Sequence, residues 1–292
     1  MKTNQRFLRA GLMTLLLTAT LSTGYYLGAT SSGSSTVAAL AGMVDTKVPT
    51  PTVFVPVGAP IPLNSLGDLK SLNATVKIDT NGVMNGKRVQ GTLNATVATN
   101  GQNKTQIVVS GPLLGDIVAQ VGGSAVSLFA PSQVEIYKVP EGTYVVVNGL
   151  FDVCVKPKAA NSTEAVEQMS PQKLMNMVTN KEVARGTFVG NETLNGTAVK
   201  HYLIDGPTFL AAAQNSKDEA LNTFGESLWS AKDADLYVSS TSGYPVSFQG
   251  SYTGNFEPLK FQGEFDVQID VTGVNQNNQI NLPSSCKNPI SQ

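Results

Sequence analysis

The chain contains a single histidine, which limits the acid–base chemistry available to it. A serine nucleophile requires a histidine base that a carboxylate orients. His201 stands in the segment Val-Lys-His-Tyr-Leu, whose alternation is typical of a strand, and no serine stands in a Gly-x-Ser-x-Gly elbow. We therefore interpret His201 as a half-exposed strand residue and not as a catalytic base.

The acidic residues and possible metal ligands give no stronger indication of catalysis. Glu264 and Asp266 stand close enough in sequence to resemble the carboxylate pair of a glycosidase. They fall on the polar face of an alternating segment, so we interpret them as solvated side chains. Clustered metal ligands and a phosphate-binding Gly-Lys loop are both missing from the sequence. The sequence thus predicts a protein that is not an enzyme and that has no metal or other cofactor.

The two cysteines, Cys154 and Cys286, are the residues most open to a covalent role. Outside the cytoplasm an even number of cysteines favours a disulfide, and two buried free thiols are the alternative. A bridge that closes so long a loop would stabilise the fold by roughly 4–5 kcal/mol in the chain-entropy model. Two thiols and one histidine do not make a zinc site.

The N-terminus predicts export across a cytoplasmic membrane. Lys2, Arg6 and Arg9 precede an apolar run over residues 10–21, and the next charged residue is Asp45. The positive charges would stay on the cytoplasmic side while the apolar run enters the membrane. The part of the chain that follows is therefore expected to be extracytoplasmic, in the periplasm or at the cell surface.

Removal of the export segment stays an open question. Leu27-Gly28-Ala29 and Ala39-Leu40-Ala41 both resemble the small-residue cleavage site of a signal peptide. If neither is cut, residues 10–29 are just long enough to span a bilayer as an anchor. No cysteine follows directly after the apolar run, so the sequence does not support an acylated lipoprotein.

A Ser- and Pro-rich stretch separates the export segment from the rest of the chain. Residues 30–41 are small and rich in serine, and residues 48–62 hold five prolines, which exclude a regular helix and favour an extended tether. We therefore divide the chain into an export segment at 1–29, a linker at 30–62 and one folded domain at 63–288.

The composition excludes a nucleic-acid binder. Only 14% of the residues are charged and the net charge is −1, so there is no basic excess to neutralise phosphates. Asparagine, threonine, serine and glycine fill the polar positions instead. They generate Asn-x-Ser/Thr triplets, which we attribute to this composition because the export segment looks bacterial, although a glycosylating secretory route could use them. The triplets begin at Asn73, Asn94, Asn103, Asn161, Asn191 and Asn195.

Alternating segments separated by glycine-containing turns predict antiparallel strands. Residues 74–78 and 93–97 alternate and are followed by Asn81-Gly82 and Asn100-Gly101, which we interpret as hairpin turns. A third hairpin runs over residues 134–146, with its turn at Pro140-Glu141-Gly142. Further strands are predicted at residues 183–190, 197–205, 235–239, 245–252 and 261–271.

The middle of the chain changes to a helical period. Ser162 can cap a first helix, and Ser170-Pro171 opens a second. Pro207 opens a short helix, and Ser216 with Glu219 forms a capping box ahead of another. This order predicts an α+β fold with a mostly antiparallel sheet and helices over its apolar face. Such an arrangement either packs solid or leaves a cavity for an apolar ligand, and periodicity does not decide between the two.

Several segments give the chain a family resemblance. Residues 190–197 read Gly-Asn-Glu-Thr-Leu-Asn-Gly-Thr, residues 235–246 run from Asp-Leu-Tyr-Val to Gly-Tyr-Pro-Val, and residues 170–174 read Ser-Pro-Gln-Lys-Leu. They are similar to two hairpins and a helical insertion of the LolA-like lipid and lipoprotein carriers. Among these, the chain resembles the mycobacterial LppX/LprG-type lipoproteins, over about residues 63–283.

The resemblance implies a curved antiparallel half-barrel sheet with helices packed over its concave face and a cavity for acyl chains between them. It implies a non-catalytic protein that holds a lipid or lipidated ligand and carries it across the periplasm or cell envelope, with a membrane or envelope surface as a further partner. It also implies that Cys154 and Cys286 tie the first hairpin to the C-terminal tail. A cell-surface structural or adhesion module, or an envelope-stress sensor domain, with a filled core is the alternative.

The apolar sheet positions and the covering helices supply the candidates for the cavity wall. The candidates on strands are Val76, Ile78, Leu93, Val97, Val134, Ile136, Tyr144, Val146, Leu203, Leu236, Val238, Val246, Phe248, Phe265, Val267 and Ile269. The candidates on helices are Leu174, Met177, Val178 and Phe209.

Overall fold

The computed structural model describes residues 58–291, except for 67–68, 85, 115–130, 150–151, 157–174, 176, 257–260 and 277. The predicted export segment, most of the linker, the helix predicted at Ser162 and the candidate Leu174 lie outside the described residues. None of the described helices is long and apolar enough to cross a membrane.

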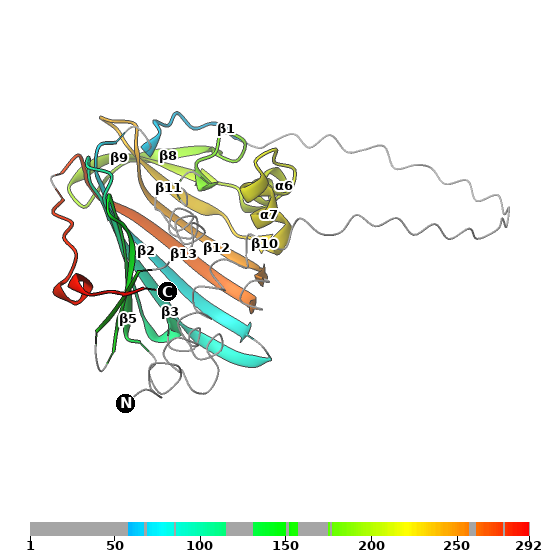
Figure 1. Cartoon of the computed structure of the whole chain (residues 1–292). Coiled ribbons are helices and arrows are strands. Elements are labelled where there is room, and N and C mark those ends of the chain that lie inside the picture. Colours follow the sequence, from blue (N-terminus) through cyan, green and yellow to red (C-terminus); the bar gives the residue numbers. More distant parts are fainter. Residues whose placement is uncertain are drawn as a thin grey trace, which may run out of the picture.

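Strands of one open sheet make up most of the described chain (Figure 1). They are β1 (Ala59–Pro60), β2 (Leu72–Met84), β3 (Lys87–Thr99), β4 (Thr105–Ser110), β5 (Gln133–Val139), β6 (Gly142–Asn148), β7 (Val153–Lys156), β8 (Arg185–Leu194), β9 (Thr197–Ile204), β10 (Leu228–Ala231), β11 (Ala234–Ser239), β12 (Pro245–Phe256), β13 (Phe261–Val274) and β14 (Ile290–Ser291). The helices are α6 (Gly206–Gln214), α7 (Glu219–Ser227) and the 3-10 helix η3 (Ser284–Lys287).

The strands follow the order β1-β8-β9-β11-β12-β13-β2-β3-β4-β5-β6-β7-β14, and β10 pairs with β12 beside this path. The printed pairings are antiparallel apart from β14 on β7, so the predicted antiparallel sheet is confirmed. The sheet twists and curls, so that strands such as β5 and β12 run in very different directions (Figure 1). Its two ends do not join into a closed barrel.

The turn predicted at Asn81-Gly82 is wrong, because β2 continues through it. Its pairing with β3 is unbroken from Leu72 opposite Thr99 to Met84 opposite Lys87. Gly82 faces Gly263 of β13, and a β-carbon on Gly82 would lie 2.3 Å from the carbonyl oxygen of Gln262. Gly82 therefore allows β2 and β13 to approach closely and is not part of a turn. A local Asn-Gly pattern cannot distinguish these two uses.

We expect Gly82→Ala to lower the free energy of unfolding by about 1–3 kcal/mol, because the new methyl group must push β2 and β13 apart. Gly190→Ala in β8 is the matched control, since a β-carbon there meets no atom within 4 Å. Urea denaturation of both variants measures the difference. Equal stability of the two variants would show that the strand contact at Gly82 is not tight.

The hairpin of β5 and β6 has a shorter turn than predicted. Val139 pairs with Gly142, so the turn holds only Pro140 and Glu141. Ile136 consequently lies opposite Val145, and not beside Tyr144 or Val146. Because side chains alternate between the faces of a strand, this one-residue difference moves every β6 side chain to the other face of the sheet.

The helices α6 and α7 begin at aspartate caps. Pro207 lies in the first turn of α6, as the sequence predicted, and the Asp205 carboxylate accepts the Thr208 backbone N–H at 2.8 Å. The predicted cap of α7 is wrong. Asp218 accepts the backbone N–H of Leu221 at 3.1 Å, so the cap is Asp218 and not Ser216. Ser216 instead accepts the N–H of Asp218 at 3.0 Å.

The fold takes in residues just before the predicted domain boundary. Ala59 and Pro60 of β1 pair with Gly186 and Arg185 at the start of β8. Ile61 is buried in the core, and its N–H donates to the Ala184 carbonyl at 3.0 Å. The proline-rich stretch therefore ends as an edge of the sheet, where a residue without an N–H is tolerated.

A disulfide joins Cys154 in β7 to Cys286 in η3, across a sequence separation of 132 residues. Both cysteines are buried in a cluster with Tyr137, Val146 and Ile280. The tail continues into β14, which pairs parallel with β7. The predicted pairing is confirmed, but it ties the C-terminal tail to β7 at one end of the sheet and not to the first hairpin.

We expect a Cys154→Ala/Cys286→Ala double variant to lose about 4–5 kcal/mol of unfolding free energy, because the bridge removes closure entropy from a long loop of the unfolded chain. Urea denaturation of the variant and of wild-type protein treated with a reductant should give the same lowered midpoint. A reduced wild-type protein that unfolds at the same urea concentration as the oxidised protein would contradict this expectation.

Candidate apolar binding site

One face of the sheet is apolar across many strands. The register aligns Leu236, Phe248, Ile269, Val76 and Ala95 in a row over β11, β12, β13, β2 and β3. The first four of these side chains are buried. The strand residues between them point to the opposite, polar face, as the period of two requires. The predicted one-sided sheet is therefore present.

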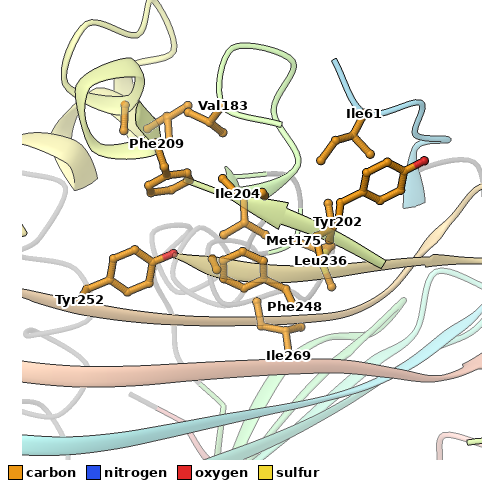
Figure 2. Packing of buried hydrophobic residues seen from close by; sticks show 14 of the residues in the cluster. Ile61, Met175, Val183, Tyr202, Ile204, Phe209, Leu236, Phe248, Tyr252 and Ile269 are labelled. Atoms are coloured by element: carbon orange, nitrogen blue, oxygen red, sulfur yellow. The ribbon is translucent and has the colours of Figure 1, made fainter. Parts of the chain in front are cut away.

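The apolar face is covered where α6 lies on it, and its side chains there are buried (Figure 2). Phe209 of α6 points down onto the sheet, toward Ile204 and Tyr252, and is only 2% exposed. Met175, from the described part of the preceding helical segment, is fully buried in the same cluster. The predicted residues that this cluster contains are Val76, Val178, Leu236, Val238, Phe248 and Ile269, together with Phe209.

A less covered patch lies next to this cluster. It consists of Ile78, Leu93, Ala95, Phe265 and Val267, which are half-buried, and we name it the central strip. The register places Val267 opposite Ile78, and Ile78 opposite Leu93. Large apolar side chains that are only half-covered can still contact a ligand, so the central strip is the candidate site.

Beyond the central strip, the apolar face continues over β3 to β6 in a second buried cluster. The predicted residues Val97, Val134 and Ile136 belong to it, and Val145 takes the place in β6 that the sequence assigned to its neighbours. Val109 and Val147 are half-buried at its surface. The central strip thus lies between two filled regions of one face.

Three predicted residues are not on this face, so their assignment was wrong. Tyr144 and Val146 lie in the cluster around the disulfide, on the other face of the sheet, because of the shorter β5–β6 turn. Leu203 is 37% exposed, since it alternates with the buried residues Tyr202 and Ile204. None of these three residues can line a site above the central strip.

Two further candidates have weaker placements. Met177 is half-buried in the helical segment that ends near Thr179. Val246 is half-buried at the start of β12, next to a register shift with β11. Both remain candidates for the margin of the site.

The sequence analysis missed Tyr252, which is the polar group of this site. Its ring contacts those of Phe209, Phe224 and Phe265, with centroids 5.8, 5.6 and 5.5 Å away. Its hydroxyl is buried and has no hydrogen-bond partner among the residues that the structure describes. Burial raises the pKa of Tyr252, so the hydroxyl keeps its proton. The alternation of Phe248, Gly250 and Tyr252 could have placed it on the apolar face.

The polar face holds the groups that were considered for catalysis. His201 lies between two carboxylates, with Nδ1 2.8 Å from Glu192 and Nε2 2.7 Å from Asp235. Its ring stacks on Tyr237 at 4.5 Å. Both ring nitrogens are therefore occupied, which fits the predicted role as a strand residue. Glu264 pairs with Lys232 at 2.6 Å.

A second polar network lies on β5. Burial by itself raises the pKa of Glu135, but hydrogen bonds from Tyr137, Asn148, Gln133 and Gln106 outweigh burial and hold that pKa below its ordinary value. The Tyr137 hydroxyl donates to the Glu135 carboxylate. Tyr137 and Tyr252 are thus two buried tyrosines of opposite character, one with its hydroxyl paired and one without.

A polar hollow of about 460 Å³ lies below the C-terminal tail. Asn278 closes its floor, donating to the carbonyls of Thr99 at 2.8 Å and Leu72 at 3.4 Å. More of its lining surface is polar than apolar, and Ile280 is the one large apolar side chain among the described lining residues, which makes it poorly suited to an acyl chain. Its lining residues are Lys70, Ser71, Asn100, Gly101, Gln102, Lys104, Asn275, Gln276, Asn278, Gln279, Ile280 and Asn281.

The comparison with known proteins gives structural matches only. No family model and no curated protein matches the chain. The structure of LprF from Mycobacterium bovis aligns with 74% of this chain and 90% of its own, at 14% identity and a TM-score of 0.38. A putative outer membrane lipoprotein-sorting protein domain from Vibrio parahaemolyticus aligns with 75% and 90%, at 8% identity and a TM-score of 0.23.

A DUF1329 family protein from Desulfovibrio piger aligns with 73% of this chain and 88% of its own, at 6% identity and a TM-score of 0.23. Superpositions with such low scores identify neither the ligand nor the residues that bind it.

We expect Tyr252→Phe to raise the unfolding free energy of the ligand-free protein by about 1 kcal/mol, because it removes a buried hydroxyl without a partner. Tyr137→Phe is the matched control and should lower it by about 1.5–3 kcal/mol, since it removes a bond to a carboxylate. Urea denaturation measures both changes. If Tyr252→Phe destabilised the protein as much as Tyr137→Phe, the Tyr252 hydroxyl would have a partner.

Proposed function

We propose that this protein is an extracytoplasmic, non-catalytic binding protein that holds an acyl chain of a lipid or lipidated ligand against the central strip. It would carry that ligand through the periplasm or cell envelope, with a membrane or envelope surface as donor or acceptor. The observation that carries this proposal is a half-covered apolar patch in the middle of an otherwise filled apolar face.

The chemistry of the central strip favours a hydrocarbon chain. Its five side chains are aliphatic or aromatic, and the fully buried residues among those described include no charged side chain. Each methylene that leaves water for such a surface contributes about 0.8 kcal/mol, so a medium-length chain suffices for useful affinity. Ligand transfer then needs no chemical step, only a second surface that competes for the chain.

The placement of the protein in an envelope has independent support. The disulfide between Cys154 and Cys286 suits an oxidising compartment. The N-terminal basic residues and apolar run favour export, and the proline-rich stretch suits a domain held off a membrane. Cleavage of the segment would give a diffusing carrier, and retention would give a tethered one.

The second candidate function is a structural or sensor domain with a filled core. The cluster below α6 favours it, because its side chains are almost completely buried by the protein itself. The two functions differ in what the central strip contacts: a ligand in the first and only the protein's own side chains in the second.

We expect Ile78→Trp to weaken binding of an acyl chain by about tenfold, because the indole occupies the space of about two methylenes on the central strip. Lys77→Trp is the matched control: it adds the same ring one residue away, on the polar face, and should leave binding unchanged. Titration with a pyrene-labelled alkane measures the affinities. Native mass spectrometry of protein exported to a bacterial periplasm detects lipid that is bound during expression.

Wild-type protein that carries no lipid and does not bind the pyrene probe would overturn the proposal in favour of the filled core. The same conclusion follows if Ile78→Trp and Lys77→Trp bind the probe equally well while both remain folded.

A further inference from the structure

We propose that Tyr252 selects the ligand, its hydroxyl donating a hydrogen bond to a carbonyl oxygen of a neutral acyl ester. This inference rests on the proposed function and deepens it, because it names the chemical class of the ligand. Among the described residues of the cluster around Tyr252, this hydroxyl is the one buried polar group without a hydrogen-bond partner.

The unpaired hydroxyl is energetically costly. Tyr252 is only 3% exposed, and no donor or acceptor in the described structure reaches its oxygen. A buried polar group without a partner costs about as much as a lost hydrogen bond, and native proteins rarely keep one without a use. A phenylalanine at this position would keep the ring contacts with Phe209, Phe224 and Phe265 without that cost.

The hydroxyl lies at the border of the central strip. A β-carbon on Gly250 would lie 2.8 Å from the Tyr252 hydroxyl oxygen, so the hydroxyl stands over a position without a side chain. Gly250 pairs with Val267, which belongs to the central strip. Figure 2 shows the Tyr252 hydroxyl pointing toward Phe248, the neighbour of Tyr252 on the apolar face. The half-buried Phe265 ring of the central strip lies 5.5 Å from the Tyr252 ring, so a chain bound on the strip would lie next to Tyr252.

The surroundings of the hydroxyl decide to which ligand oxygen it donates its hydrogen bond. Because burial raises the pKa of Tyr252, the group is a donor at neutral pH. A fatty-acid carboxylate would lose its hydration there, and the buried polar side chains among the described residues are serines and threonines, with no cation to compensate. An ester carbonyl accepts one hydrogen bond without carrying a charge. A plain alkane would fill the same space but leave the hydroxyl unpaired.

The test compares hexadecane, methyl palmitate and palmitate as competitors of a pyrene-labelled alkane, with wild type and Tyr252→Phe. We expect the preference of wild type for the ester over the alkane to fall by about tenfold in Tyr252→Phe, as the loss of one buried hydrogen bond requires. The aqueous solubility of each competitor cancels when the two proteins are compared. Palmitate should compete less well than its methyl ester with wild type.

Tyr202→Phe is the control, because Tyr202 lies on the same face, 8% exposed and two strands away, beside Phe188. It should keep the full preference for the ester. An unchanged preference in Tyr252→Phe, or tighter binding of palmitate than of the ester by wild type, would overturn the inference while leaving the carrier function intact. Failure of all three competitors and of the pyrene probe to bind wild type would overturn the proposed function itself.

Discussion

The antiparallel register of β2 with β3 and β13 is the constraint on which the rest of the structure depends. These three long strands pair over almost their whole lengths, and Gly82 opposite Gly263 allows their backbones to approach closely. Since side chains alternate between the faces of a strand, this register places Val76 and Ile269 together and sends Lys77 and Gln268 to the other face. The apolar face, its filled clusters and the central strip all follow from it.

The two faces of the sheet have different tasks. On the polar face, charged and polar side chains pair with one another, as His201 does with Glu192 and Asp235. The apolar face is sealed by α6 at one end and is filled over β3 to β6 at the other. The central strip between them is only half-covered, and Tyr252 of the first cluster, next to the strip, lacks a hydrogen-bond partner among the described residues. A ligand on the central strip would both cover these side chains and give the Tyr252 hydroxyl a hydrogen-bond partner.

Much of the architecture could be predicted from local patterns. The strand from Phe261 alternates clearly, the helix at Pro207 has a proline and an aspartate cap, and the two cysteines pair as expected. The errors arose where a pattern has two physical meanings. Asn81-Gly82 has the composition of a hairpin turn, but Gly82 instead allows the backbones of β2 and β13 to approach closely. The predicted β5–β6 turn was one residue longer than the observed turn. The prediction therefore placed Tyr144 and Val146 on the wrong face of the sheet.

The sequence by itself determined that the protein has a one-sided antiparallel sheet, because the period of two and the turn residues are encoded locally. It also determined the pairing partners of the disulfide, since only two cysteines exist. Only the tertiary structure decided which part of the apolar face is filled and that Tyr252 is buried without a partner. Those properties depend on contacts between residues far apart in the chain, such as Phe209 on Tyr252, which no local period contains.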